Sequence, residues 1–299
     1  MTPLIVVLGG EGMLGHKVFQ CLRERFPGTR CTIRSSRENE PLRRIDLLRG
    51  PDVVERVDVT DEGRFAEVLD QLQPDVIVNC VGVIKQRSEA KDPIPSIAIN
   101  ALLPHRLAAW LHGRNGRLIH FSTDCVFSGR RGGYTEDDPS DAEDLYGRTK
   151  FLGEVAAANA LTLRTSMIGR ELFEHRSLLD WFLQQKHKRV RGFTGVRYSG
   201  VTTNHLAGLV GDILERHPRL SGLYQVASDT ITKYDLLCRL KEAYRLDVDI
   251  VPDEDEVCDR SLRGDRFRAA TGHVCPPWSE LVHQLADDPT PYDEWVTLT

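Results

Sequence analysis

The sequence predicts an α/β protein in which helices cover both faces of a doubly wound parallel sheet. Three observations support this prediction. Short apolar runs rich in β-branched residues recur through the first 165 residues, segments with helical spacing alternate with them, and glycines crowd the first strand-to-helix connection. This alternation is typical of parallel sheets, because each parallel pair of strands needs a crossover that is usually a helix.

The expected elements begin at the N-terminus. Residues 4–8, Leu-Ile-Val-Val-Leu, form an unbroken apolar run that is typical of a buried parallel strand. Apolar residues at helical spacing follow over 13–22. Further strands are expected at 31–33, 56–59, 76–78, 118–121 and 161–163, and further helices at 65–72, at 97–111 with a kink at Pro104, and at 146–158. Residues 1–165 are therefore expected to form the sheet domain.

After residue 165 the alternation weakens, because charged stretches and prolines interrupt it. We expect residues 166–299 to form mainly a smaller substrate-binding region, from which some elements could return to the main sheet. No stretch resembles a long linker. The tail from Asp287 onward is expected to be poorly held, as chain ends often are.

Composition and charge restrict the function classes. The chain has 299 residues, a net charge of -5, 40% hydrophobic residues and 28% charged residues, which is ordinary for a globular protein. Without a basic surplus, a nucleic-acid partner is not expected. No run approaches the ~18 apolar residues that span a bilayer, and the N-terminus lacks the basic segment of a secretory signal. Seven scattered cysteines without a C-x-x-C pair argue against disulfides and a zinc site, so a reducing cytoplasm is expected.

Glycines after the first expected strand predict a dinucleotide site. Gly9, Gly12 and Gly15 form G-x-x-G-x-x-G, a variant of the dinucleotide fingerprint, between a strand and a helix. Such glycines permit a tight turn and let the backbone approach a pyrophosphate. Met13 and Leu14 begin the helix, whose free N–H groups would face the phosphates. The sheet domain is therefore expected to be Rossmann-like.

Residues after the second expected strand bear on the choice of dinucleotide. NAD sites usually place Asp or Glu there for the ribose hydroxyls. This chain instead has Arg34, Ser35 and Arg37, whose cations and hydroxyl suit a 2′-phosphate. Glu11 in the glycine loop argues mildly against a phosphate nearby. We therefore expect NADP(H) as the cofactor, with use of NAD(H) left open.

Asp58 and Val59, at the expected end of the third strand, could contact the adenine amino group. The alternative is structural, because this segment could cap the next helix, a role that Thr60 could fill in either case. The sequence leaves both interpretations open.

Tyr146 and Lys150 stand four positions apart, so on a helix their side chains point into the same space. A free tyrosine has a pKa of about 10, too high for efficient proton transfer at neutral pH, and a nearby cation lowers it. Ser122, Thr123 and Asp124 follow an apolar run upstream. The pattern Tyr-x-x-x-Lys is weak by itself, but beside a dinucleotide loop it predicts a tyrosine that acts as a general acid.

With these residues together, the chain resembles the extended short-chain dehydrogenases/reductases, and within them the dTDP-4-dehydrorhamnose reductase group, which reduces 4-keto sugars on nucleotides. The similarity is carried by segments 9–15, 79–82, 122–129, 146–150 with 153–154, 163–166 and 222–228. It implies NAD(P)H-dependent reduction of a 4-keto-6-deoxy sugar linked to a nucleoside diphosphate, in deoxysugar and polysaccharide biosynthesis. A homodimer is left open.

The resemblance also implies roles for particular residues. Thr123 would hydrogen-bond the substrate carbonyl, Tyr146 would donate the proton, and Lys150 would orient the nicotinamide ribose and lower the tyrosine pKa. The residues that would line or support the cofactor are Cys80, Val81, Gly82 and Asn100, the last of which could instead be a structural tie between helix and strand. The expected substrate set is Lys85, Thr123, Asp124, Cys125, Val126, Tyr146, Met167 and Arg260.

Two residues of that set qualify the choice of substrate. Met167 stands where rhamnose reductases usually carry an aromatic residue, so the identity of the sugar is left open. Arg260, in a stretch with three further arginines, is our first choice for contact with the substrate diphosphate.

Two alternative functions come from relatives with the same fold. In GDP-fucose synthases a cysteine at the position of Cys125 helps to epimerise the keto sugar before reduction, and His175 could be its partner here. The simpler interpretation is that Cys125 is an inert pocket wall. The regulatory subunit of methionine adenosyltransferase binds NADP without a known need for sugar reduction. The presence of Thr123, Tyr146 and Lys150 favours catalysis over this binding-module alternative.

Overall fold

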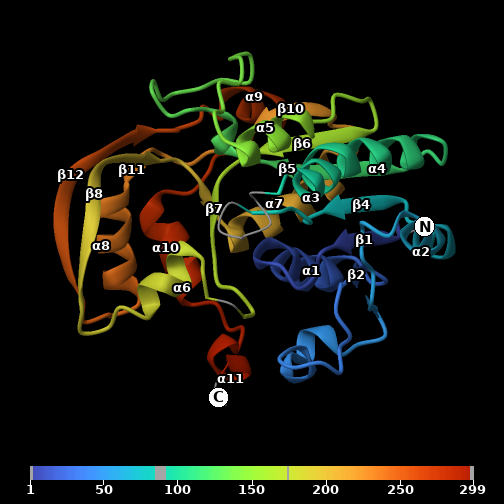
Figure 1. Cartoon of the computed structure of the whole chain (residues 1–299), viewed down its shortest axis with the longest axis horizontal. Helices are drawn as coiled ribbons and strands as arrows, with labels where there is room; N and C mark the ends of the chain where they lie inside the picture. Colours follow the sequence, from blue (N-terminus) through green and yellow to red (C-terminus); the bar gives the residue numbers. More distant parts are fainter. Residues whose placement is uncertain (1–2, 85–91, 174, 297–299) are drawn as a thin grey trace.

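Seven parallel strands form the central sheet of the computed structural model, which describes residues 3–84, 92–173 and 175–296 (Figure 1). In spatial order they are β10 (Gly222–Gln225), β6 (Ala160–Arg164), β5 (Arg117–Ser122), β4 (Val76–Asn79), β1 (Ile5–Leu8), β2 (Arg30–Thr32) and β3 (Val53–Val54). The order reverses direction between β1 and β4, and parallel sheets bind ligands at such a switch point. The prediction of a Rossmann-like parallel sheet is confirmed.

Helices cover both faces of this sheet. Alternate residues of β1 enter two separate apolar cores, Ile5 with α1 (Met13–Arg25) and Val6 with α2 (Glu62–Leu72). Successive strand residues point to opposite faces, so the two cores lie on opposite sides of the sheet. On the first side, α1 packs against α7 (Thr203–Arg216); on the second, α4 (Leu103–His112) joins α2. The sheet is therefore doubly wound.

The third strand was predicted at the wrong residues. It covers Val53–Val54, and the chain then turns back across the end of β2, where Arg56 has a φ of 58° and its N–H donates to the Ser35 carbonyl at 3.2 Å. The expected strand at 56–59 is wrong because this positive φ ends the extended conformation.

The long helix expected at 97–111 has three parts. They are α3 (Pro93–Ser96), the π-helical turn η4 (Ile97–Leu102) and α4. Pro104 lies in the first turn of α4, directly after the π-helical turn η4. The helix expected at 146–158 is the shorter α5 (Leu145–Leu152), which ends at Gly153, where a Cβ would overlap the Asn100 carbonyl.

Much of the remaining chain packs beside the main sheet, at the left of Figure 1. A three-stranded sheet contains β11 (Ile231–Thr232), β8 (Arg189–Tyr198) and β12 (Asp249–Asp259). A third apolar core joins it to α6 (Leu178–Leu183), α8 (Lys233–Ala243) and α10 (Trp278–Ala286). The shorter elements are η1 (Leu42–Arg44), η2 (Asp46–Leu48), η5 (Asp124–Val126), β7 (Met167–Ile168), β9 (Val201–Thr202), α9 (Asp265–Thr271) and α11 (Tyr292–Val296).

The described part of the C-terminal tail, residues 287–296, packs against the rest of the chain, and its prediction as a poorly held segment is wrong. Tyr292 and Trp295 of α11 are 4% and 8% exposed and pack into the core that contains α1. Asp288 forms a buried ion pair with Lys17 of α1 at 2.6 Å. Tyr292 and Thr290 of the tail contact His16 and Lys17, which lie about 270 positions away in the chain. No local pattern could therefore indicate these contacts.

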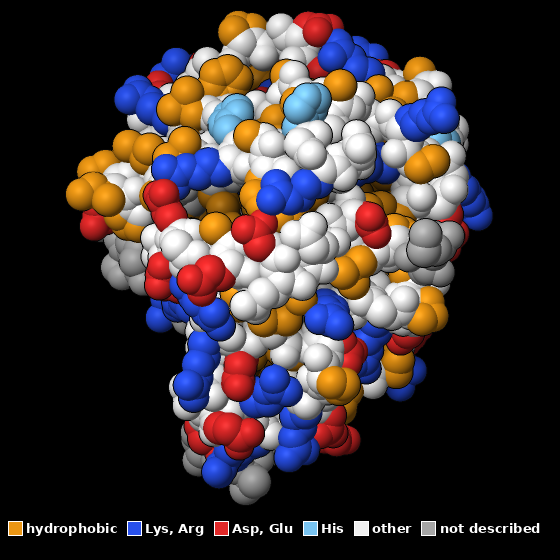
Figure 2. All heavy atoms as spheres, turned by 90° about the vertical axis from the view of Figure 1, so that its right-hand side faces the viewer, with side chains coloured by type: hydrophobic (Ala, Val, Ile, Leu, Met, Phe, Trp, Pro, Cys, Tyr) orange, Lys and Arg blue, Asp and Glu red, His pale blue; other side chains and the backbone are white. Residues whose placement is uncertain are grey.

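Charges of both signs are interspersed over the face in Figure 2. Many belong to exposed ion pairs, such as Arg114 with Asp70 at 2.9 Å and Arg49 with Asp46 at 3.0 Å. None of the helices in the described ranges is long and apolar enough to cross a membrane.

Candidate active site

The residues predicted to form a site gather where the strands end. Because the strands are parallel, the segments that follow β1, β4 and β5 meet at one edge of the sheet. These segments carry the glycine loop, the loop that begins at Cys80, and Thr123. Helix α5 adds Tyr146 and Lys150.

The glycine loop is shaped by contacts that exclude side chains. Gly9 has a φ of 82°, and a Cβ on Gly15 would overlap the Gly9 carbonyl. Gly12 caps α1 without any side-chain hydrogen bond, so the first N–H groups of the helix, at Met13 and Leu14, are open to a ligand. A tight backbone cradle at a helix N-terminus fits the pyrophosphate of a dinucleotide.

The residues after β2 divide into two groups. Arg34 is exposed, and its backbone N–H donates to Glu11 Oε1 at 2.9 Å, so this residue stands beside the glycine loop. Arg37 instead donates to the carbonyls of Gly50 and Val53, both at 3.1 Å. The prediction that Arg37 offers a cation to a 2′-phosphate is therefore corrected, because its guanidinium is bound to the backbone carbonyls of Gly50 and Val53.

Asp58 and Thr60 form a local turn. Asp58 Oδ1 accepts from the Thr60 N–H at 2.9 Å and from the Thr60 hydroxyl at 2.6 Å, and these bonds lower the pKa of Asp58. The cap of α2 is Asp61, which accepts from the Arg64 N–H, so Thr60 does not cap that helix. Val59 is half-buried beside the core under α2.

Two asparagines hold the loop after β4. Asn100 accepts from the Val83 N–H at 2.9 Å and donates to the Val83 carbonyl at 3.0 Å. Its amide also approaches the Thr149 hydroxyl of α5 at 3.4 Å. Asn79 accepts from the Val81 N–H at 3.1 Å. The loop of Cys80, Val81 and Gly82 is thus fixed to α5 rather than left to move.

Thr123 and Tyr146 occupy one small space. The Thr123 hydroxyl donates to Asp124 Oδ1 at 3.2 Å and accepts from the Cys125 N–H at 3.2 Å. Burial raises the pKa of Tyr146, an electrostatic interaction with Cys125 adds to this rise, and a hydrogen bond with Thr123 opposes it. The two hydroxyls are therefore within hydrogen-bonding reach of each other.

Lys150 lies under Tyr146 but is bound elsewhere. Its Nζ donates to the Phe121 carbonyl at 2.6 Å, and the side chain is buried. Burial lowers the pKa of Lys150 to about 8, although the Glu154 carboxylate opposes this. The expected fall of the Tyr146 pKa is not found in this structure, because burial of the phenol raises the pKa and the Asp124 and Asp144 carboxylates raise it further.

A buried ion pair lies beneath this site and was not predicted. Arg164 donates to both oxygens of Glu154, at 2.9 and 2.7 Å, and the two side chains are 2% and 8% exposed. The Ser122 hydroxyl also donates to Glu154 at 2.6 Å, and Arg164 stacks 5.0 Å from the Phe127 ring. The pair ties β6 and α5 to the strand that precedes Thr123. A carboxylate just after Tyr-x-x-x-Lys is the one sequence signal that could have indicated it.

The segment after Thr123 contains both accessible and buried residues. Cys125 is half-buried, and burial raises the pKa of its thiol to about 12. Val126 is fully buried in a small core with Phe127, Tyr134 and Leu262. The prediction that Val126 contacts the substrate is therefore wrong, because its side chain is buried in this core. Asp124 is 9% exposed.

Arg260 and Lys233 approach this segment from the C-terminal part. Arg260 Nε donates to the Phe127 carbonyl at 2.9 Å, and Cys125 and Asp124 are among the charges that raise the pKa of Arg260 against its burial. Burial lowers the pKa of Lys233, and the same two groups oppose this. Lys233 Nζ lies 4.1 Å from the Tyr198 ring centroid. The structure thus brings Arg260 and Lys233 within electrostatic reach of Cys125.

Other predicted residues lie elsewhere or outside the described part. Met167 is half-buried in β7, against the core that contains α1. His175 lies 3.6 Å from Asp180 rather than at Cys125. Arg268 pairs with Asp265 at 2.7 Å, away from the Thr123 segment. Lys85 falls outside the described residues.

A model of the RmlD substrate binding domain matches residues 1–287, nearly the whole chain. The chain belongs to this family. The sequence resemblance to extended short-chain dehydrogenases/reductases of the dTDP-4-dehydrorhamnose reductase type is thereby confirmed.

Several proteins resemble this RmlD family member. A probable dTDP-4,6-dihydroxy-2-methyloxan-3-one 4-ketoreductase of Streptomyces antibioticus is 30% identical over 237 residues, covering 77% of this chain and 76% of that protein. A probable low-salt glycan biosynthesis reductase of Haloferax volcanii is 33% identical over 54% of this chain; the match spans about half of that protein, 52%. Methionine adenosyltransferase 2 subunit beta of Rattus norvegicus is 23% identical over 81% of this chain and 72% of that protein.

A solved structure shares the fold. It is the dTDP-4-dehydrorhamnose reductase of Bacillus anthracis str. Ames in complex with NADP, with a TM-score of 0.76, 17% identity, and coverage of 95% of this chain and 99% of that chain. At this identity the likeness shows the fold alone.

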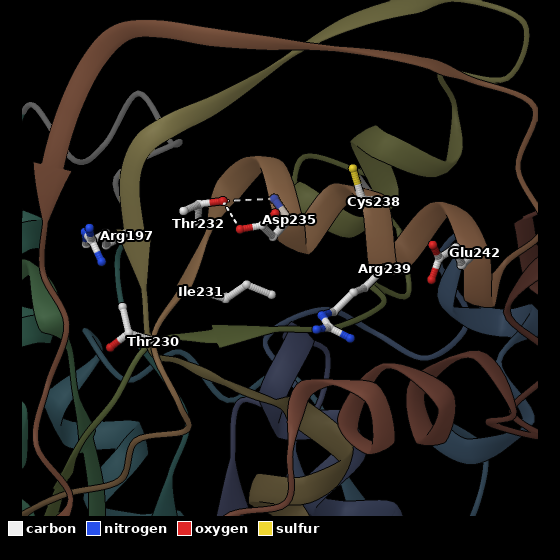
Figure 3. Close-up of a pocket in the computed structure, with 8 residues that line it drawn as sticks. All are labelled: Arg197, Thr230, Ile231, Thr232, Asp235, Cys238, Arg239 and Glu242. Atoms are coloured by element: carbon white, nitrogen blue, oxygen red, sulfur yellow. Dashed lines mark hydrogen bonds between the residues drawn. The ribbon is translucent and has the colours of Figure 1, made fainter.

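A cavity in this RmlD family member lies over α8, and Tyr146 is not among the residues that line it. It has a volume of about 550 Å³ and opens over one face of α8 and the end of β8. Figure 3 shows its lining residues Arg197, Thr230, Ile231, Thr232, Asp235, Cys238, Arg239 and Glu242. Thr232 caps α8 through hydrogen bonds with Asp235, at 2.7 Å to the carboxylate and 3.0 Å from the N–H.

Proposed function

We propose that this protein is an NAD(P)H-dependent reductase of a 4-keto-6-deoxy sugar carried on a nucleoside diphosphate. The observation that carries the proposal is the convergence of the Thr123 and Tyr146 hydroxyls beside Lys150, at the sheet edge that also holds the glycine cradle. Only a reaction that moves a proton next to a dinucleotide needs this combination. The names of the relatives, two reductases among them, agree with it.

The proposed roles follow from the hydrogen bonds. A bound NADPH supplies the hydride to the carbonyl carbon of the sugar. As charge develops on the sugar oxygen, Thr123 turns its hydroxyl hydrogen from Asp124 to that oxygen, and Tyr146 delivers the proton. The raised pKa keeps Tyr146 protonated, so the proton to be donated is present before the reaction begins.

Lys150 has a positioning and electrostatic role in this proposal. Its bond to the Phe121 carbonyl places the ammonium at the sheet edge, where a nicotinamide ribose would lie. Once Tyr146 has given up its proton, the ammonium stabilises the phenolate. The Glu154 carboxylate, itself held by Arg164, favours the charged form of Lys150.

NADP(H) is the proposed cofactor, and Arg34 is the residue proposed to select it. Arg34 is exposed beside the glycine loop, whereas Glu11 accepts only its backbone N–H. A guanidinium pairs well with a 2′-phosphate. Glu11 remains available to a ribose hydroxyl, which keeps NAD(H) as a second, weaker cofactor in the proposal.

The substrate diphosphate is proposed to bind between Arg260 and Lys233. Both cations interact electrostatically with Cys125 and Asp124, which supports a position next to the proposed sugar site. Two cations from separate segments suit a ligand with two phosphates.

Turnover of a panel of nucleotide-linked 4-keto-6-deoxy sugars with NADPH tests the proposal. We expect at least one member of the panel to oxidise NADPH. The reaction is followed as a fall in the absorbance of NADPH at 340 nm, which is proportional to the amount of sugar reduced. The binding-module alternative predicts copurification with a synthetase and no turnover. The 23% identity to the regulatory subunit gives it less support than the 30% identity to the ketoreductase.

We further propose a homodimer and a cytoplasmic location. Five large apolar side chains are exposed on neighbouring helices α3, η4 and α5: Ile94, Ile97, Leu102, Phe151 and Leu152. A second copy of the chain would remove them from water. The seven cysteines are all free thiols, which suits a reducing compartment. Sedimentation of the parental chain and of Leu152→Glu tests the dimer, which the substitution is expected to dissociate.

A further inference from the structure

Residues 288–295, here called the C-terminal strap, cross the first turn of α1. Asp288 accepts from Lys17 Nζ at 2.6 Å, and both side chains are at most 7% exposed. Thr290 accepts from the same Nζ at 2.8 Å. Tyr292 Oη lies 2.8 Å from His16 Nε2. The strap therefore packs on the helix turn that directly follows the glycine cradle.

His16 continues this contact into the cradle itself. Its Nδ1 lies 2.9 Å from the carbonyl oxygen of Gly12, the residue that caps α1. A carbonyl oxygen only accepts, so Nδ1 carries the hydrogen and Nε2 accepts from the Tyr292 hydroxyl. Burial lowers the pKa of His16 to about 4, so the imidazole is neutral and this arrangement is stable at neutral pH. One chain of hydrogen bonds thus runs from the strap to the central glycine of the loop.

The other side of the strap is tied to the region beside the sheet. Arg170 pairs with Asp293 at 2.7 Å and with Asp180 at 2.8 Å, and its guanidinium lies 5.0 Å from the centre of the Tyr292 ring. Asn204 of α7 donates to Asp288 at 2.9 Å. The strap is therefore held by Arg170 and by Asn204, and it reaches the glycine cradle through the buried imidazole of His16.

We propose that the C-terminal strap positions the phosphate-binding loop, so that docking of residues 288–295 holds Gly12 and the first turn of α1 in the geometry that receives a dinucleotide. The inference rests on the cofactor part of the proposed function and not on the sugar. Tyr292 and His16 are positioning residues in it. Because coupling between two binding events is reciprocal, cofactor binding strengthens docking of the strap by the same factor.

A matched pair of substitutions tests this proposal. Tyr292→Phe keeps the ring and its packing but removes the hydroxyl that His16 accepts from. Tyr244→Phe is the control, because its hydroxyl donates to the Leu285 carbonyl of α10 at 3.0 Å and so loses a comparable buried bond away from α1. We expect the NADPH Kd, measured by fluorescence titration, to rise about 3- to 10-fold in Tyr292→Phe, the size of one lost hydrogen bond, and less than about twofold in Tyr244→Phe. Equal Kd values in the two variants would overturn the proposal.

Hydrogen exchange of the parental chain gives a second test that needs no substitution. Amides of residues 288–295 are expected to exchange several-fold more slowly with saturating NADPH than without it. Unchanged exchange in the strap while the glycine loop is protected would overturn the coupling. A chain that binds NADPH with this protection but reduces no keto sugar would refute the proposed function and leave the strap in place. A chain that binds neither NADPH nor NADH would refute both.

Discussion

The two halves of the candidate site are built in different ways. The cofactor half uses residues that are neighbours in the chain: Gly9 to Gly15 form one turn, and Tyr146 and Lys150 lie on one short helix. The substrate half is assembled from separate segments, with Cys125 after β5, Lys233 at the start of α8 and Arg260 after β12.

The two halves also differ in the groups that would bind a ligand. Apart from the Arg34 and Lys150 side chains, the cofactor half offers backbone N–H groups and hydroxyls, whose positions are set by the backbone. The substrate half offers long cationic side chains, one over the Tyr198 ring and one on the Phe127 carbonyl. The binding groups of a backbone cradle stay in place when most side chains are substituted, whereas a site built from side chains changes with each substitution. The cofactor and the chemistry are therefore expected to be fixed features, with the substrate half as the variable one.

The largest effect is expected from loss of the Tyr146 hydroxyl in the cofactor half, and it tests the difference between the two halves. Tyr146→Phe keeps the ring but removes the proton, so kcat is expected to fall on the order of 10²–10⁴-fold. The NADPH Kd is expected to change little. Steady-state kinetics and a cofactor titration measure both quantities. A variant that reduces the keto sugar at the parental rate would contradict the mechanism.

Removal of a cation from the substrate half should act on binding instead. Arg260→Ala is expected to raise KM for the nucleotide sugar about 10- to 100-fold, the size of a charge-assisted contact, with a smaller effect on kcat. Arg268→Ala is the control, because Arg268 pairs with Asp265 on the surface and should leave KM near the parental value. An unchanged KM in Arg260→Ala would remove Arg260 from the substrate site.

Raising the pH should lower kcat/KM, because Lys150 in the cofactor half loses its charge. A lysine is charged below its pKa, and the pKa of Lys150 is lowered to about 8, so the ammonium is lost as the pH rises through that value. The raised pKa of Tyr146 keeps the phenol protonated over the same range. We expect kcat/KM, which reports the free enzyme, to be level below about pH 8 and to fall about tenfold per pH unit above it. In Lys150→Arg the guanidinium stays charged, so a fall that remains near pH 8 would assign it to another group.

Cofactor choice should depend on one arginine of the pair after β2. Arg34→Ala is expected to weaken NADPH binding about 3- to 10-fold and to leave NADH binding unchanged, because an exposed charge-assisted contact is lost. Arg37→Lys is the matched control, since the Arg37 guanidinium donates to the carbonyls of Gly50 and Val53. Tighter binding of NADH than NADPH in the parental chain would contradict the proposed preference.

The smallest effect is expected at Cys125. Because burial raises the pKa of its thiol to about 12, Cys125 is protonated at neutral pH and is a poor base. Cys125→Ser should change kcat by less than about twofold, and no solvent deuterium should enter C3 or C5 of the product sugar. Deuterium at either carbon would favour the epimerase–reductase alternative.

Local pattern was enough to predict the sheet, the glycine cradle and the Tyr146–Lys150 pair. Each depends on residues within a few positions of one another, where periodicity and glycine conformation determine the structure. Local pattern was misleading at 56–59, where Arg56 adopts a positive φ, and the family resemblance was misleading at Val126, which is buried with Tyr134 and Leu262. In both cases the deciding contacts come from elsewhere in the chain.

The sequence by itself determined the family, the fold class and the chemistry that the sheet edge can perform. Only the tertiary structure decided that Arg37 binds backbone, that Glu154 and Arg164 lie under the site, that Lys233 reaches Cys125, and that the tail docks on His16. The physical reason is that burial, which shifts each pKa and selects each ion pair, depends on neighbours that the folded chain brings together. The contact between Tyr292 and His16 joins residues 276 positions apart, and no spacing within the sequence encodes it.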